Sequence, residues 1–356
     1  MRRKALILAE GVYGSTDGKT AHGLVRRSER FEVLGVIDSE YAGMDAGVVL
    51  DGRPRGIKVY SSLEEALSEH PEAEVLIVGA AVAGGRLPPG YREVVLSALR
   101  RGMDVVSGLH EFLSDDPEIS RVAREHGAEV VDVRKIYNGW RTFYTGEIDE
   151  VRSLKVVVVG TDSAIGKRTT ALMLTDALVE RGLRAVFVGT GQTAWMQGAK
   201  YGIVLDAMVN DFITGGLERE IVRAYREEKP DVIVVPGQGA LLHPAFPGSL
   251  EILNVVRPEV VVLQHAPRRR HLDGYPQYPM PDLERYLKLL ELITGRRVYA
   301  ITINTEGMSP EEADEVAEEY ERKYGVVACA PLVHGVGKVA DRLVEDLPRL
   351  WSSTAR

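Results

Sequence analysis

The chain has 356 residues, 45% apolar and 27% charged, a length that exceeds what one hydrophobic core usually organises, so two domains are expected. The 44 Lys and Arg against 52 Asp and Glu leave a formal net charge of -8, which disfavours nucleic acid and anionic membrane surfaces as partners.

Cysteine usage and hydropathy indicate the compartment. Cys329 is the only cysteine, so no intrachain disulfide and no Cys-rich metal site can form. No apolar run reaches the roughly 18 residues of a spanning helix, and the apolar stretch at the start is too short for a signal peptide. We expect a cytoplasmic homo-oligomer, and abundant Arg and Glu with scarce Asn, Gln and Cys indicate a thermophilic source.

Short β-branched runs alternate with amphipathic segments along the whole chain, the pattern of parallel sheets covered by helices. We expect strands at residues 4–10, 32–38, 73–79 and 103–108, and then at 154–160, 184–189, 231–237, 259–265 and 297–304. A polar and aromatic connector at 138–153 separates the two sets. The prediction is two doubly wound α/β domains, 1–150 and 151–356.

The first half begins with a strand, a glycine-containing turn and a helix. The next strand ends at Asp38, where a dinucleotide-binding fold places the acid that hydrogen-bonds a ribose. Gly11 and Gly14 do not complete G-x-G-x-x-G, so the glycines are equally well explained as turn residues. We therefore expect a Rossmann-like domain, and dinucleotide binding stays open.

The second half opens with "KVVVVGTDSAIGKRTTALMLTDALVERG", residues 155–182. A phosphate-binding loop needs a strand, small residues in the bend and a Gly-Lys pair at a helix start, because amide N–H groups and the lysine converge on the anion. All three are present, and a P-loop NTPase-like domain is expected. The residues expected to hold the cofactor are Gly160, Thr161, Asp162, Ser163, Ala164, Gly166, Lys167, Arg168, Thr169 and Thr170.

Two departures from the usual spelling leave the identity of the anion open. Gly160 lies one residue early, which makes the loop one residue longer, and Arg168 stands where a Ser or Thr would bind magnesium. Thr169 or Thr170 could substitute. No acid ends the strand before Gly237, so Asp162 and Asp211 are the possible stand-ins, and the predicted metal ligands are Thr169 and Asp162.

Polar residues follow the other strands of this half, where doubly wound sheets bind ligands. Gln192, Gln238, Arg268 and Arg269 are predicted to hold the substrate, the arginines because their forks suit carboxylates. The catalytic candidates are His243, His265 and Asp211, and His243 is favoured as the base because its glycine-rich neighbourhood permits close approach. Alternatives remain: a capped helix for Asp211, an exposed basic turn for the arginines and structural roles for the histidines.

The loop "GTDSAIGK" resembles that of dethiobiotin synthetase and related P-loop enzymes. The whole chain resembles a two-domain family now associated with D-glutamate N-acetyltransferase, on the motifs "GTDSAIGKRTTALML", "GTGQTAWMQG", "VVPGQGALLHPAF" and "QHAPRR". The resemblance implies an acidic amino acid as substrate and acetyl-CoA as cofactor, its phosphates held by the loop. Related folds also contact a nucleotide base near Asn304, Thr305 and Glu306.

Two other functions stay open. An ATP- and Mg-dependent ligase or kinase of a carboxylate would use Lys167 and Thr169 for the nucleotide and metal. A nucleotide-binding protein without catalysis would bind its ligand in the first half. Polar groups in several separate loops favour an enzyme over this last alternative.

Overall fold

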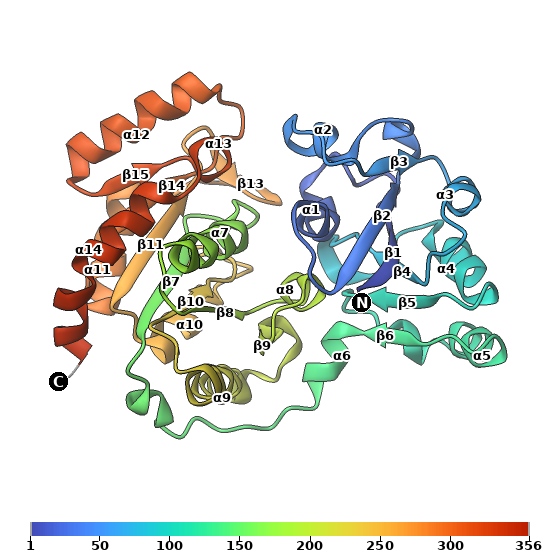
Figure 1. The fold of residues 1–356 in the computed structure, drawn as a ribbon, viewed down its shortest axis with the longest axis horizontal. Coiled ribbons are helices and arrows are strands. Elements are labelled where there is room, and N and C mark those ends of the chain that lie inside the picture. Colours follow the sequence, from blue (N-terminus) through green and yellow to red (C-terminus); the bar gives the residue numbers. More distant parts are fainter. Residues whose placement is uncertain (1, 355–356) are drawn as a thin grey trace. The chain divides into compact units, whose positions relative to one another are not determined.

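The structure is a computed structural model that describes residues 2–354, and the chain forms two compact units. Unit 1 contains the residues up to Gly139 together with Gln192–Ala199, and unit 2 contains Trp140–Gly191 and the residues from Lys200 onward. Each unit is built on a parallel sheet with helices, as the sequence predicts (Figure 1). The units differ from the predicted ranges at two places, the boundary after Gly139 and the short segment that belongs with unit 1.

The sheet of unit 1 has six parallel strands in the order β3-β2-β1-β4-β5-β6, which is the order of a Rossmann fold. Its strands are β1 (Arg3–Leu8), β2 (Phe31–Ile37), β3 (Lys58–Tyr60), β4 (Val75–Val78), β5 (Asp104–Ser107) and β6 (Val130–Asp132). Its helices are α1 (Lys19–Arg26), α2 (Ala46–Asp51), α3 (Leu63–Glu69), α4 (Tyr91–Arg100), α5 (Pro117–Glu125) and α6 (Val133–Asn138), with 3-10 turns η1 (Thr16–Gly18), η2 (Ser39–Tyr41), η3 (Ala83–Gly85) and η4 (Leu113–Asp115).

The core of unit 1 follows from the alternation of its strands. Leu6 and Leu8 of β1 and Leu76 and Val78 of β4 are fully buried in one cluster with residues of α3, α4 and α5. Right-handed crossovers in one direction along the sheet place these three helices on the same face. Each buried aliphatic side chain contributes about 1.5–3 kcal/mol of burial free energy.

The loop after β1 is closed by atoms of unit 1 itself. The buried carboxylate of Asp38 accepts the N–H of Tyr13 at 3.1 Å and that of Glu40 at 3.0 Å. The side chain of Tyr41 covers Gly14, where an added Cβ would lie 2.1 Å from the tyrosine oxygen. Asp38, which stands where a dinucleotide-binding fold has its ribose-binding acid, therefore already binds two backbone amides.

Helix α8 (Gln192–Gln197) is the segment of the second half that belongs to unit 1. Thr193 lies 3.1 Å from Thr20 between their hydroxyl oxygens, and the side chain of Gln197 donates to the carbonyl of Gly23 at 2.8 Å. The guanidinium of Arg30 lies 4.0 Å from the ring centroid of Trp195. These contacts make α8 part of the packing of unit 1.

Unit 2 has seven parallel strands in the order β15-β14-β11-β7-β10-β8-β9, so the phosphate-loop strand β7 is central. Its strands are β7 (Leu154–Gly160), β8 (Ala185–Gly189), β9 (Tyr201–Gly202), β10 (Val232–Pro236), β11 (Val260–His265), β14 (Ala300–Ile303) and β15 (Val327–Cys329), and β12 (His271–Leu272) and β13 (Tyr275–Pro279) form a separate antiparallel hairpin. Its helices are α7 (Lys167–Glu180), α9 (Asn210–Glu228), α10 (Ser249–Val256), α11 (Leu283–Thr294), α12 (Pro310–Tyr324), α13 (Pro331–His334) and α14 (Gly337–Thr354), with 3-10 turns η5 (Glu147–Glu150) and η6 (Leu205–Ala207).

Helix α7 packs on the sheet through apolar side chains spaced four positions apart. Leu174 and Leu178 of α7 are fully buried in one cluster with Val156 and Val158 of β7 and with residues of α14. The crossover from β9 back to β10 runs in the opposite direction along the sheet, so α9 covers the other face (Figure 1). Strand β7 is thus buried on both faces, and its carboxyl end has a fixed position for the loop that follows.

Candidate functional site

The loop between β7 and α7 has the backbone of an anion-binding nest. Ala164 has φ 51° and Gly166 has φ 104°, both in the left-handed region, while α7 begins directly afterwards at Lys167. Alternation of right- and left-handed residues turns successive N–H groups toward one side of the chain. The sequence provides for this with small residues at 163 and 164 and a glycine at 166.

Three amide donors of the bend have no acceptor among residues 2–354. The start of the loop is fixed, because Thr161 N–H donates to the carbonyl of Gln264 at 3.0 Å. The N–H groups of Ala164, Ile165 and Gly166, by contrast, make no hydrogen bond to any of residues 2–354. Three adjacent N–H groups without an acceptor, directly before a helix start, form a donor set for an anion.

Lys167 lies in the curl of this loop. Its Nζ donates to the backbone carbonyl of Asp162 at 2.6 Å, and its side chain is 7% exposed. A Cβ added to Gly160 would lie 3.0 Å from Cδ of Lys167 and 2.8 Å from Cδ1 of Ile165. Glycine at 160 is therefore needed for the lysine to run back across the end of the strand.

Asp162 holds the bend in shape. Its fully buried carboxylate accepts the N–H of Ser163 at 2.7 Å, Nη1 of Arg269 at 2.9 Å and the N–H of Asp273 at 2.9 Å. His243 Nε2 lies 3.7 Å away. A role for Asp162 as a metal ligand stays a prediction, and it would require releasing some of these donors.

Arg269 and Asp273 connect the loop to two further segments. Arg269 also donates to the carbonyl of Ser163 at 2.9 Å and to the carboxylate of Glu306 at 2.6 Å. The hydroxyl of Ser163 donates to Oδ2 of Asp273 at 2.7 Å. Asp273 stands at the turn of the β12–β13 hairpin, so the hairpin is bonded to the phosphate loop.

The imidazole of His243 is engaged at both nitrogens. Nδ1 accepts the N–H groups of Ala245 at 3.2 Å and Phe246 at 3.1 Å, which makes Nε2 the protonated nitrogen, and Nε2 lies 3.4 Å from the carbonyl oxygen of Asp273. The side chain is 0% exposed. In this geometry His243 shapes the turn that follows β10, and the lone pair a base needs is already used.

His265 ends β11 beside the loop. Its Nδ1 lies 3.0 Å from the hydroxyl oxygen of Thr161, and Nε2 makes no hydrogen bond to any of residues 2–354. Burial lowers the pKa of His265 to about 4, so the ring is neutral at pH 7. When Nδ1–H donates to Thr161, Nε2 carries the lone pair.

The threonines after Lys167 differ in their surroundings. The hydroxyl of Thr170 is buried and donates to Oε1 of Gln264 at 2.6 Å, which also accepts the hydroxyl of Thr302 at 2.6 Å. Thr169 is half-buried and makes no hydrogen bond through its hydroxyl to the described residues. Of the two threonines, Thr169 is therefore the one whose hydroxyl is not used in a hydrogen bond within residues 2–354.

Comparison with known proteins agrees with this two-part architecture. The model of the Domain of unknown function (DUF1611_C) P-loop domain matches residues 142–340, and that of the Domain of unknown function (DUF1611_N) Rossmann-like domain matches residues 39–136. The chain belongs to the DUF1611 family.

Two proteins similar to this chain are named after an enzymatic activity. A D-glutamate N-acetyltransferase of Tritonibacter scottomollicae is 31% identical over 79% of this chain and 84% of its own length, and one of Pseudoalteromonas sp. is 30% identical over 76% and 81%. A crystal structure of a DUF1611 family protein from Anabaena variabilis is 30% identical and covers 97% of this chain and 100% of its own, with TM-score 0.88. The expectation that the chain is an enzyme is confirmed, since both of these relatives are named as N-acetyltransferases.

The predicted substrate residues lie in different surroundings. Arg269 is engaged by the loop, while Arg268 is exposed and pairs with Glu312. Gln238 donates to the carbonyl of Thr190 at 2.9 Å, next to the end of β8. Gln192 belongs to unit 1, where its side-chain oxygen lies 3.3 Å from Nη2 of Arg134.

Asp211 and Asn304 also have defined places. Asp211 is exposed in the first turn of α9, which fits a residue favourable to a helix start, and its catalytic role stays a prediction. Asn304 donates from its side chain to the carbonyl of Ile165 at 3.0 Å. Asn304, at the end of β14 where a contact to a nucleotide base was expected, therefore supports the phosphate loop through a hydrogen bond to its backbone.

Sequence reasoning missed the hairpin at β12–β13 and its residue Asp273. Asp273-Gly274 between two short runs is a known signal of a tight hairpin, and Gly274 has φ 75°. The sequence thus contained this signal. Within residues 2–354 no group of three or more His, Cys, Asp or Glu is arranged to hold a metal. None of the helices in this range combines the length and the hydropathy of a transmembrane span.

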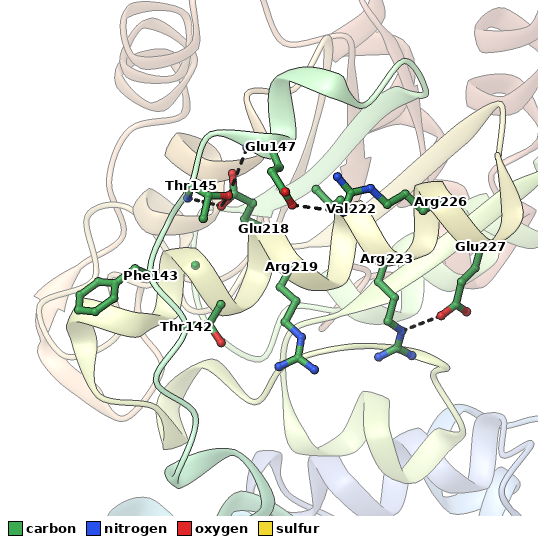
Figure 2. A pocket seen from close by; sticks show the side chains of 11 residues that line it. Thr142, Phe143, Thr145, Glu147, Glu218, Arg219, Val222, Arg223, Arg226 and Glu227 are labelled. Atoms are coloured by element: carbon green, nitrogen blue, oxygen red, sulfur yellow. Dashed lines mark hydrogen bonds and ion pairs between the residues drawn. The ribbon is translucent and has the colours of Figure 1, made fainter.

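A concave region of unit 2 lies between the connector after Trp140 and α9, with a volume of about 430 Å³ (Figure 2). The connector reaches α9 closely at Gly215, where an added Cβ would lie 2.1 Å from the carbonyl oxygen of Thr142. The buried carboxylate of Glu218 holds it there by accepting the N–H of Thr145 at 2.6 Å. Arg223 and Arg226 line this region and form ion pairs with Glu220 and Glu150. None of the residues that line it belongs to the phosphate loop.

Proposed function

We propose that the chain is an acetyl-CoA-dependent N-acetyltransferase that acts on D-glutamate or a closely related amino acid. The observation that carries the proposal is the set of amides at Ala164–Gly166 with Lys167 at the helix start. Two relatives named for this activity, each about 30% identical over most of the chain, support the acceptor.

The residues of the loop fit a pyrophosphate. Adjacent N–H donors and the buried ammonium of Lys167, which donates to the carbonyl of Asp162, give a positive cradle with two kinds of donor. Asp162 is neutralised by Arg269, so it adds little repulsion against an anion. The phosphates of acetyl-CoA would be held by Ala164, Gly166 and Lys167.

The chemistry at the acceptor needs a neutral amine. Acetyl-CoA supplies the acetyl group as a thioester; the new C–N bond replaces the C–S bond, and the proton lost by the amine balances the thiolate that leaves. Of the two predicted histidines, His265 has an uncommitted ring nitrogen and is neutral at pH 7. We assign it the role of proton acceptor, because bound carboxylates and phosphates beside it would raise its pKa toward the working pH.

The test is thiol release from acetyl-CoA with a panel of D- and L-amino acids. We expect D-glutamate or a close relative to give the fastest release, and His265→Gln to lower kcat by about 100-fold or more, in the range of lost general-base catalysis. His243→Gln is the matched comparison and is expected to act mainly through stability. Absence of thiol release with every amino acid would remove the proposal.

An ATP- and Mg-dependent ligase remains the second candidate on one observation, the uncommitted hydroxyl of Thr169 two residues after Lys167. It predicts ADP production stimulated by a carboxylate substrate. The same amino-acid panel with ATP and magnesium in place of acetyl-CoA separates the two candidates. Cytoplasmic location, the homo-oligomer and the thermophilic source stay predictions.

A further inference from the structure

Three aromatic side chains of unit 2 lie next to one another, one in the turn after β10 and two on β13. Phe246 is 48% exposed and Tyr278 is 46% exposed, and Tyr275 is half-buried between them. The ring centroids of Phe246 and Tyr275 are 6.3 Å apart, and those of Tyr275 and Tyr278 are also 6.3 Å apart. We call these three side chains the aromatic platform.

The platform has a fixed support. The ring of Phe246 stacks on that of His243 at 4.8 Å with an interplanar angle of 29°, and Tyr275 meets His243 edge-on at 5.3 Å. The backbone of Phe246 is held twice, since its N–H donates to His243 Nδ1 and its carbonyl accepts the N–H of Ala240 at 2.9 Å. Phe246 and Tyr275 therefore have little conformational freedom to lose when a ligand binds.

The platform is also bonded to the phosphate loop. Asp273, two residues before Tyr275, donates its N–H to Asp162 and accepts the hydroxyl of Ser163. Ser163 is the neighbour of Ala164, whose amide is the first of the uncommitted donors. Flat apolar surface and phosphate donors are therefore parts of one connected structure.

We infer that the aromatic platform is the subsite for the purine ring of the coenzyme, with the phosphates on the adjacent loop. The inference rests on the proposed function, because acetyl-CoA carries an adenine one ribose away from its pyrophosphate. A dicarboxylic amino acid offers no flat apolar group to stack on the rings of the platform. Bases stack on aromatic side chains whatever their hydrogen-bonding edge, so a platform without polar partners is sufficient.

The segment at β14 supports the same assignment. Asn304, where a base contact was expected, bonds the carbonyl of Ile165, and Glu306 pairs with Arg269. Both side chains are occupied in holding the loop. A purine therefore has its apolar surface on the hairpin side of the loop.

The decisive experiment compares acetyl-CoA with S-acetyl-pantetheine, which carries the same thioester without the nucleotide. In the double variant Phe246→Ala/Tyr278→Ala we expect KM for acetyl-CoA to rise by about 5- to 100-fold, the range for loss of aromatic stacking on a base. Its KM for S-acetyl-pantetheine should stay within about twofold of the parent value, because this thioester has no purine to stack. Its kcat with either thioester should also stay within about twofold, because the purine of acetyl-CoA lies at the opposite end of the molecule from the acetyl group. Equal changes with both thioesters, or none with either, would overturn the inference.

Matched variants separate ring stacking from bulk and from folding. Phe246→Leu keeps the apolar volume and should lose affinity like the alanine variant, whereas Tyr278→Phe keeps the ring and should behave as the parent. Phe143→Ala removes another exposed ring, 66% exposed on the connector, and should leave both KM values unchanged.

A calorimetric titration with ADP keeps the inference testable apart from acetyl transfer. If the parent protein transfers no acetyl group from either thioester, the proposed function fails. The platform then still predicts ADP binding that the double variant weakens by the same factor. ADP binding of equal strength in parent and double variant, or no ADP binding by the parent, would contradict the purine subsite.

Discussion

The first strand of unit 1 and the first strand of unit 2 both lead through a glycine-containing loop into a helix, but the two loops use their polar groups differently. In unit 1, Asp38 accepts the amides of Tyr13 and Glu40, and Tyr41 covers Gly14. In unit 2, the carboxylate of Asp162 accepts a hydrogen bond from the guanidinium of Arg269, and the amides of Ala164–Gly166 have no acceptor among residues 2–354. The same topology thus gives one loop that is satisfied internally and one that is prepared for an anion.

The carboxylates of the two loops provide the strongest way to test this contrast. Asp162→Asn leaves Arg269 without its buried partner, and removing one member of a buried ion pair costs about 3–5 kcal/mol. Asp38→Asn removes only backbone hydrogen bonds and should cost about 1 kcal/mol. Urea unfolding followed for each unit checks both, and equal losses would show that the two aspartates have the same role.

The histidine beside the unit 2 loop sharpens the contrast through pH. Because the folded pKa of His265 is about 4, below the unfolded value of about 6.5, the stability it contributes is present above pH 6.5 and is lost as pH falls toward 4. The loss amounts to about 3 kcal/mol. The free energy of unfolding, measured from pH 7.5 to pH 4, should fall less steeply in His265→Gln than in the parent, and parallel curves would contradict the buried neutral ring.

Each unit places a lysine first in the helix after its loop, and this pair tests the difference in function. Lys167→Met removes a charge-assisted contact to a phosphate and should weaken binding of acetyl-CoA by about 10- to 100-fold, as expected for a hydrogen bond to a charged group. Lys19→Met, at the first residue of α1, should leave it unchanged. Calorimetry with CoA measures both variants, and a comparable loss in Lys19→Met would implicate the unit 1 loop as well.

The smallest effect is expected at Tyr41. Tyr41→Ala uncovers Gly14 and should change the free energy of unfolding by about 1 kcal/mol or less, as for a surface position. Because Asp38 remains bonded to its two amides, we expect no binding of NADH to either protein in a fluorescence titration. NADH binding gained by the variant would show that unit 1 contains a ligand site covered by its own tyrosine.

The fold was predictable where strands are long and buried. The run at 154–160 predicts β7 residue for residue, because a central parallel strand is apolar on both faces and leaves no ambiguity. The strands β3, β6 and β15 were not predicted, since each has three residues, too few for a periodic pattern. Their sequences become strands because a sheet edge is already present beside them.

Only the part of the site that is continuous in sequence, the phosphate loop, was predictable. Small residues before a Gly-Lys pair predict the loop, and the observed φ values at Ala164 and Gly166 have the alternation such a loop needs. The partners of Asp162 come from Arg269 and Asp273, more than one hundred positions away, and no local pattern pairs them. Arg269 was predicted to meet a substrate carboxylate because spacing cannot show that an internal carboxylate already holds it.

Because α8 belongs to unit 1 although it lies within the sequence of unit 2, the two units cannot be separated by a single cut of the chain. A fragment that ends near residue 139 would lack the helix whose Gln197 and Thr193 bond α1, so neither half of the gene encodes a complete unit 1. Separate expression of the first unit would call for a graft of residues 192–199 onto its terminus. Recombination in evolution would meet the same obstacle, and the two units are expected to be inherited together.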